Sequence, residues 1–179
     1  STDFSLTSAK TLGDQYNQIG ADIDGEAGGD ESGYDLAFSS DGTRIAIGAI
    51  RNDSAGGNFG EVKIYDYENG SWVQHGEIQG INISSNFGYS ISLSSDGSII
   101  AIGAQQQHVA GVGDYSGAVT IYKDINNVWT QLGSTLESEQ LYNQFGRSVS
   151  LSGDGTRVAI GAPFHDVEGN TENAKIQGR

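Results

Sequence analysis

The residues best suited to chemistry are the carboxylates of a glycine-rich segment near the N-terminus, namely Asp22, Asp24, Glu26 and Asp30. Carboxylate oxygens are the ligands that Ca²⁺ prefers, and interleaved glycines let a loop wrap around an ion. The segment therefore predicts a calcium site, and calcium is the one cofactor considered. The alternative is an exposed turn between repeat units, because the corresponding later segments carry few carboxylates.

Three asparagines stand in Asn-x-Ser triplets, the acceptor pattern for N-linked glycans: Asn52, Asn69 and Asn82. All three fall in segments that we expect to be loops, where a glycan would be accessible. Such triplets also arise by chance in a chain rich in asparagine and serine. A glycoprotein is therefore an expectation that depends on these three sites.

No motif typical of a catalytic centre is present. The histidines His75, His108 and His165 lie in different parts of the chain, with neither metal-ligand spacing nor a serine partner. A nucleophile elbow, a phosphate-binding loop and a His-Glu-x-x-His motif are absent. Cysteine is absent as well, which excludes disulfides and thiolate chemistry. We therefore expect a protein that is not an enzyme.

The elements that must position these residues repeat along the chain. Residues 33–49, 87–104 and 145–162 each carry an Asp-Gly pair followed by an apolar Ile/Val-Ala-Ile-Gly-Ala run. Gly60–Tyr65 matches Gly117–Tyr122, and a Trp-x-Gln-x-Gly sequence follows each of them. The Asp-Gly pairs are 55 and 58 residues apart. A regular period of this length indicates one structural unit per repeat.

Each unit is predicted to form four short strands. The Asp-Gly pair, in which both residues tolerate positive φ, favours a hairpin between the first two strands. The second strand is apolar or small on both faces, so we expect a sheet on each side of it. Gly48, Gly103 and Gly161 fall inside this strand, which predicts close approach of a neighbouring sheet. Trp72 and Trp129 recur in register and are expected in the core.

Four-stranded units that repeat with glycine and aromatic markers predict an all-β fold made of β-propeller blades. A β-solenoid has shorter coils, and a jelly roll needs no repeat. The first unit covers residues 33–86, the second 87–144 and a partial third 145–179. Residues 1–32 hold the acidic loop and the remnant of an outer strand at Tyr16–Gly20. About three blades form an incomplete propeller, or one that is closed by oligomerisation.

The repeat resembles the FG-GAP family, which builds the β-propeller of integrin α subunits and of secreted surface proteins. The Phe-Gly element falls at Phe87–Gly88 and Phe145–Gly146, with a degenerate copy at Gly33–Tyr34, and Gly161–Pro163 matches Gly-Ala-Pro. The resemblance covers about residues 16–165. It implies an extracellular or cell-surface protein with structural or adhesive roles.

The repeat departs from this family at its hairpins. Many FG-GAP hairpins hold calcium with several carboxylates, whereas here one aspartate remains in each: Asp41, Asp96 and Asp154. One carboxylate cannot supply a site of six to eight oxygens, so we expect no calcium there.

Charge and composition limit the partners. The formal net charge of −14 repels nucleic acids and anionic membranes, and no apolar run is long enough to span a bilayer. Tyr34, Tyr89, Tyr115 and Phe59 fall at strand starts or in loops and are candidates to line a carbohydrate- or peptide-binding face. The chain begins at Ser1 without methionine, and the third unit is partial, so we expect a fragment or a protomer of a larger assembly.

These observations favour a non-enzymatic structural or adhesive module that contacts proteins, further copies of itself or glycans. Two alternatives remain open at this point. One is the propeller domain of a secreted polysaccharide-active enzyme, and the other is a designed or reconstructed propeller fragment.

Overall fold

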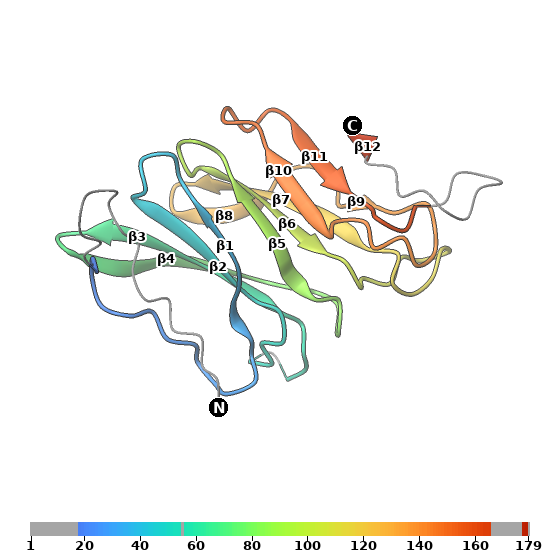
Figure 1. The fold of residues 1–179 in the computed structure, drawn as a ribbon, viewed down its shortest axis with the longest axis horizontal. Coiled ribbons are helices and arrows are strands. Elements are labelled where there is room, and N and C mark those ends of the chain that lie inside the picture. The colour runs from blue at the N-terminus through green and yellow to red at the C-terminus, as the bar shows by residue number, and fades with distance from the viewer. Residues whose placement is uncertain (1–17, 55, 166–176, 179) are drawn as a thin grey trace.

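The computed structural model describes residues 18–54, 56–165 and 177–178 and shows an all-β protein, which confirms the predicted class (Figure 1). The strands, in chain order, are β1 (Ser32–Phe38), β2 (Arg44–Ala49), β3 (Glu61–Glu68), β4 (Ser71–Gln79), β5 (Phe87–Leu93), β6 (Ile99–Ala104), β7 (Ala118–Ile125), β8 (Val128–Gln131), β9 (Leu136–Glu137), β10 (Ser148–Leu151), β11 (Val158–Gly161) and β12 (Gln177–Gly178). Among the described residues, no helix has the length and apolarity needed to cross a membrane.

The strands form three antiparallel sheets, each built from one repeat unit. The first sheet has the order β1-β2-β3-β4, and the second has the order β5-β6-β7-β8, with β9 also paired to β7. The third sheet runs β10-β11-β12. Its Ile160 pairs with Gln177 as Ile102 of the second sheet pairs with Thr120, so β12 takes the position of β7. Lys175 and Ile176, also predicted for this strand, lie outside the described residues.

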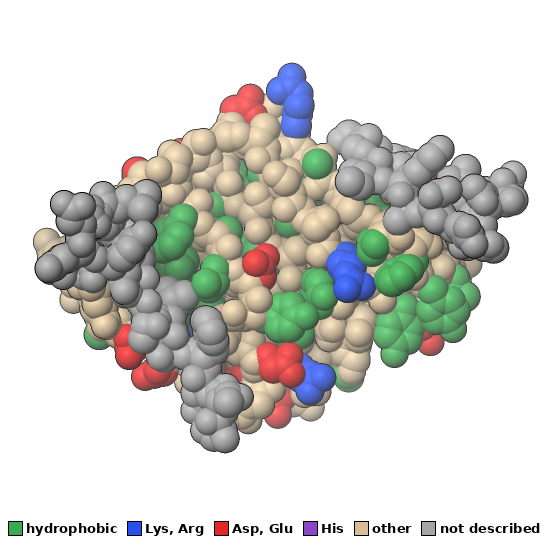
Figure 2. All heavy atoms as spheres, in the orientation of Figure 1, with side chains coloured by type: hydrophobic (Ala, Val, Ile, Leu, Met, Phe, Trp, Pro, Cys, Tyr) green, Lys and Arg blue, Asp and Glu red, His purple; other side chains and the backbone are tan. Residues whose placement is uncertain are grey.

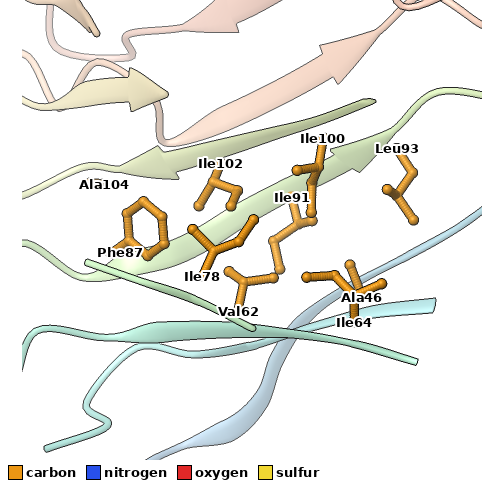
Figure 3. Packing of buried hydrophobic residues seen from close by; sticks show 10 residues of the cluster. All are labelled: Ala46, Val62, Ile64, Ile78, Phe87, Ile91, Leu93, Ile100, Ile102 and Ala104. Atoms are coloured by element: carbon orange, nitrogen blue, oxygen red, sulfur yellow. The ribbon is translucent and has the colours of Figure 1, made fainter. Parts of the chain in front are cut away.

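The sheets stack in chain order, with β5 against β1 and β2, and β10 against β5 and β6 (Figure 1). We call the side of a sheet that looks toward the next sheet along the chain its forward face, and the opposite side its rear face. The core between the first two sheets joins one forward face to one rear face (Figure 3). Its members are Ala46, Val62, Ile64, Ile78, Phe87, Ile91, Leu93, Ile100, Ile102 and Ala104.

The second and third sheets repeat this packing with Ala101, Val119 and Ile160 at the centre. Because side chains alternate along a strand, Ile100 and Ile102 point to the first sheet while Ala101 points to the third. The second strand of the first two units is therefore covered on both faces, as predicted.

The glycines inside these strands are required by the stacking. A Cβ at Gly48 would collide with the carbonyl oxygen of Gly88, and one at Gly103 with that of Gly146. Both carbonyls belong to the Phe-Gly element of the next unit, where Gly88 and Gly146 have φ of 91° and 85°. The predicted close approach of sheets at Gly48 and Gly103 is confirmed.

The hairpins differ from the expected geometry. Only the glycine of each Asp-Gly pair has positive φ, and five residues, 39–43 in the first unit, separate the strands. Two-residue turns instead join the third and fourth strands, at Asn69–Gly70 and Asn126–Asn127, with positive φ at all four residues. Positive φ at both central residues matches the twist of a tight hairpin, so these turns are shorter than predicted.

The tryptophans of the fourth strands link neighbouring units. A Cβ at Gly20 would lie 2.9 Å from Trp72 Cδ1, and one at Gly76 would lie 3.0 Å from Trp129 Cδ1. The Trp-x-Gln-x-Gly sequence thus provides an indole on one unit and a surface for the next indole on the preceding one. Tyr16 and Asn17 lie outside the described residues, and residues 18–31 form no strand.

Candidate functional site

Tyr34 and Tyr89 lie side by side at equivalent positions of the first two units. Their ring centroids are 4.9 Å apart with planes inclined by 44°, and Tyr34 is 44% exposed. Burial, together with the hydrogen bond and the charge of Tyr89, raises the pKa of Tyr34 to about 12. The Tyr34 phenol is therefore neutral near pH 7. The structure brings together two of the four aromatic residues predicted to form a binding face.

A second aromatic pair joins Tyr115 to Tyr142. The rings stack with centroids 6.0 Å apart and planes at 27°, while 44% and 59% of the two residues remain exposed. Both have left-handed backbone conformations, with φ of 55° and 60°. This conformation is unfavourable for a bulky side chain, and such outliers concentrate at functional sites. Two tyrosines are thus held at the surface at a conformational cost.

The loops that carry this pair are fastened to each other. The backbone N–H of Gln144 donates to the Tyr115 carbonyl at 3.2 Å, and that of Phe145 donates to the Ser116 carbonyl at 2.9 Å. Inside the second loop, buried Asn143 accepts hydrogen bonds from Ser138 Oγ at 2.8 Å and from the Phe145 N–H at 3.1 Å. The stacked rings therefore stand on a fixed backbone.

Arg147 and Phe164 extend this surface. Arg147 occupies the repeat position of Tyr34 and Tyr89, and its guanidinium carbon lies 5.7 Å from the Phe164 ring centroid. Arg147 Nη1 donates to Gln144 Oε1 at 2.6 Å. Figure 2 shows hydrophobic side chains gathered beside a basic one over the loops at the right of Figure 1. We name the aromatic loop surface by its members, Tyr34, Tyr89, Tyr115, Tyr142, Arg147 and Phe164.

Phe59, also predicted for this face, lies elsewhere, since a Cβ on Gly57 would contact both Phe59 and Ile83. Sequence reasoning missed Tyr142, Arg147 and Phe164. The repeat holds the signal for Tyr142, because Gly29 and Ser84 take its place in the other units, both with positive φ. A large side chain where its counterparts are small indicates a role outside the core.

The acidic residues near the N-terminus bind separate partners. Asp22 Oδ1 accepts from Gln18 Nε2 at 2.8 Å, and Glu26 Oε1 lies 2.5 Å from Lys63 Nζ. Asp30 is buried, and Asn52 Nδ2 donates to its Oδ2 at 3.4 Å. Among the described residues, no three His, Asp or Glu side chains are arranged to hold a metal ion. A calcium ion on Asp22, Asp24, Glu26 and Asp30 stays a prediction.

The electrostatics of this segment follow from those partners. The hydrogen bond and charge of Lys63 lower the pKa of Glu26, whereas burial raises the pKa of Asp30. Lys63 also lies 3.8 Å from Oε2 of Glu61, a side chain that is almost fully buried. Burial raises the pKa of Glu61, and its Oε2 has no hydrogen-bond partner. One ammonium group therefore serves two carboxylates.

The three sequon asparagines differ in exposure. Asn52 lies in the expected loop, but it is only 4% exposed, and its Oδ1 accepts from Ser54 Oγ at 2.6 Å. Asn69 is exposed in the β3–β4 turn, and Asn82 is half-buried between β4 and β5. The folded chain therefore offers its most accessible acceptor at Asn69, and the expectation of accessibility is wrong for Asn52.

The hairpin aspartates organise their own loops. Asp41 Oδ1 accepts from Ser39 Oγ at 2.7 Å, from Thr43 N at 3.0 Å and from Thr43 Oγ1 at 2.9 Å. Asp96 and Asp154 make the same three contacts in their units. These hydrogen bonds lower the pKa of Asp41 and Asp154 to about 2. The single retained carboxylate of each hairpin therefore serves the turn.

A cluster of charged side chains connects the first two sheets. Arg44 Nε lies 2.6 Å from Asp66 Oδ1, and its Nη1 lies 3.0 Å from Asp124 Oδ2. His75 bridges the same carboxylates through Nδ1 at 3.0 Å and Nε2 at 2.7 Å. Burial raises the pKa of Asp124, but hydrogen bonds from His75 and Arg44 outweigh it, and the net pKa is lowered. Because the guanidinium occupies the space between the carboxylates, the cluster acts as a clasp.

The other two histidines serve local contacts. His108 Nδ1 lies 2.9 Å from Asp114 Oδ1, and both residues are exposed. His165 Nδ1 lies 3.5 Å from Asn143 Nδ2.

A cavity of about 410 Å³ lies between β9 and the third sheet. Its apolar lining includes Leu136, Phe145, Ile160 and Ala162. These are the repeat counterparts of Ile78, Phe87, Ile102 and Ala104, which form the closed core between the first two sheets. The cavity therefore marks the short third sheet, where β12 contributes two described residues.

No model of a known protein family matches the chain, and a search of curated proteins finds no match to it.

Proposed function

We propose that the chain is a structural and adhesive module of β-propeller type, of the FG-GAP kind, from a secreted or cell-surface protein. Three antiparallel sheets, one per repeat unit and stacked face to face in chain order, support the propeller architecture. The sequence resemblance to FG-GAP repeats supports the extracellular setting. In this proposal the sheets form a scaffold, and its loops bind.

The observation that carries the proposal is the stacked pair Tyr115 and Tyr142. Both rings are exposed, both backbones are left-handed, and their loops are joined by backbone hydrogen bonds. Rigid tyrosines present large contact areas at low entropic cost, which suits recognition. Exposed aromatic residues that add nothing to the core are typical of a binding surface.

The ligand that fits this surface is a neutral glycan. The apolar C–H face of a sugar ring packs on an aromatic face, and its hydroxyl groups need polar partners at the rim. Arg147, Gln144, His108 and Asp114 lie in or beside the same loops. The net charge of −14 disfavours anionic polysaccharides.

Replacement of Tyr142 by serine tests this function. Ser84 holds the same left-handed position in the second unit, so Tyr142→Ser removes the ring without imposing a new backbone. We expect the wild type to bind neutral oligosaccharides on a glycan array, and the variant to bind at least tenfold more weakly in calorimetry. The matched control is Ile81→Ala, which truncates a side chain that is 78% exposed outside this surface. Equal binding by wild type and Tyr142→Ser, or no glycan bound by either, contradicts the proposal.

A further inference from the structure

The forward face of the third sheet is open where its counterparts are closed. Ala46 and Ala101, at the centre of the first two forward faces, are 0% exposed. Ala159 holds the same position in β11 and is exposed. Ser148 and Ser150 are exposed on this face, whereas Ser90 Oγ donates to the Gly146 carbonyl and Ser92 Oγ accepts from the Leu151 N–H.

The positions that receive the next unit are unfilled on this face as well. Gly48 and Gly103 lie against the Phe-Gly backbone of the following unit, whereas a Cβ at Gly161 would meet only Ser148 of its own sheet. Gly20 and Gly76 carry the indole of the following unit, whereas a Cβ at Gly133 would have no heavy atom within 4 Å. Strand and outer-strand positions agree that the third unit lacks a following sheet among the described residues.

Size complementarity defines what can cover this face. In both internal interfaces a forward face of small residues, glycine, alanine and serine, meets a rear face of large ones, such as Phe87 and Ile91. Two forward faces would leave gaps between them, because small side chains face small side chains. The fitting surface is a rear face with a left-handed glycine after its first residue and a tryptophan on its outer strand.

A second copy of the chain does not offer such a surface. Its single terminal rear face is that of the first sheet, where Ile45 is 0% and Ile47 is 4% exposed. Residues of the N-terminal segment, among them Ile23, lie against this face at Ile47 and Ala49. The rear end of the stack is therefore already covered, and the forward end is not.

We propose that the forward face of the third sheet is a docking surface for a further sheet of this same repeat, supplied by a different polypeptide. The docked sheet seats its Phe-Gly backbone on Gly161, its rear aliphatic side chains on Ala159 and its tryptophan on Gly133. The inference rests on the proposed role of the chain as a module of a larger assembly, and it names the partner's chemistry.

Thiol accessibility at Ala159 tests the docking surface, because the chain contains no cysteine. In the full chain, we expect the thiol of the Ala159→Cys variant to react with a maleimide at least a hundredfold faster than that of Ala101→Cys. The docking sheet is then supplied by appending a second copy of residues 123–165 directly after Arg179. The register of β12, in which Gln177 corresponds to Thr120, places the appended Phe145–Gly146 at its native spacing.

We expect the appended sheet to slow labelling of Ala159→Cys at least tenfold, and to protect the Ser148–Leu151 amides from hydrogen exchange. The matched control carries Gly146→Val in the appended copy alone, which blocks its approach to Gly161 and restores fast labelling. Labelling that stays fast beside an appended sheet seen to fold by circular dichroism overturns the docking surface. Protection of the unextended chain that grows with its own concentration overturns the different polypeptide in favour of a second copy. Neither readout involves glycan binding, so failure here is distinct from failure of the proposed function.

Discussion

At the scale of single residues, the units differ most where one of them places a charge that its counterpart lacks. Glu61 is almost fully buried at the position that the second unit fills with Ala118. Its Oε2 has no hydrogen bond, and the neighbouring Lys63 is closer to Glu26 than to Glu61. Burial raises the pKa of Glu61, so the folded state holds a proton more tightly than the unfolded chain. Stability at this residue therefore decreases as pH rises from the ordinary glutamate pKa through the raised one.

Replacement of Glu61 by glutamine removes this ionisation. We expect Glu61→Gln to increase the free energy of unfolding at pH 7.5 by about 1 kcal/mol, since an ionised and unsatisfied carboxylate is lost. The gain disappears at pH 4, where the native carboxyl is protonated. Urea denaturation across this pH range measures both, with exposed Glu77→Gln as the control. A gain that is independent of pH, or a loss at pH 7.5, argues against this account.

At the scale of elements, the units are joined by backbone that approaches backbone. Gly103 lies beneath the Gly146 carbonyl, which also accepts a hydrogen bond from Ser90 Oγ at 2.8 Å. A side chain at Gly103 would displace both groups from β6. The glycine excess of the sequence is explained in part by this requirement.

We expect Gly103→Ala to lower the free energy of unfolding by about 2–3 kcal/mol through overpacking. Gly161→Ala, whose added methyl meets only a serine side chain, is expected to cost less. The control is Gly28→Ala, because its Cβ would have no heavy atom within 4 Å and its φ is not left-handed. Equal destabilisation by Gly103→Ala and Gly28→Ala would remove the link between these glycines and sheet packing.

The elements were largely predictable from the sequence, and the binding surface was not. Period-two alternation and the recurring Ile-Gly-Ala runs indicated strands and an all-β class, because those patterns reflect burial on sheet faces. Tyr34 and Tyr89 were found because they repeat. Tyr142 and Arg147 were missed because neither matches its counterparts, and their neighbours come from loops brought together only by the fold. The same holds for Arg44, which stands where the second unit has Ile99.

At the scale of the whole molecule, Arg44 and its partners tie the first sheet to the second. The cluster draws residues from β2, β3, β4 and β7, and the side chains of its members are 11–22% exposed. Removal of the cation from a partly buried pair of carboxylates leaves both uncompensated, which costs more than the pair contributes.

Arg44→Ile installs the residue of the second unit at this position. We expect it to lower the free energy of unfolding by about 2–4 kcal/mol, because Asp66 and Asp124 lose their guanidinium. The triple variant that adds Asp66→Asn and Asp124→Asn is expected to recover more than half of this loss. Arg51→Ile is the control, since Arg51 forms an exposed ion pair with Glu31 that contributes about 1 kcal/mol or less. Denaturant unfolding decides the matter, and an Arg44→Ile variant as stable as Arg51→Ile would refute the clasp.

The hairpin loops also join the sheets through bonds that involve no side chain. The Ser40 N–H donates to the Ser95 carbonyl at 2.9 Å, and the Ser95 N–H donates to the Gly153 carbonyl at 2.8 Å. These bonds run along the stack, across the strand direction. A tensile load that pulls one sheet from the next must therefore break peptide hydrogen bonds and expose the apolar core in the same event. In an adhesive protein this couples mechanical resistance to the backbone, so the residue between serine and aspartate in each hairpin is free to drift in sequence while the joint keeps its strength.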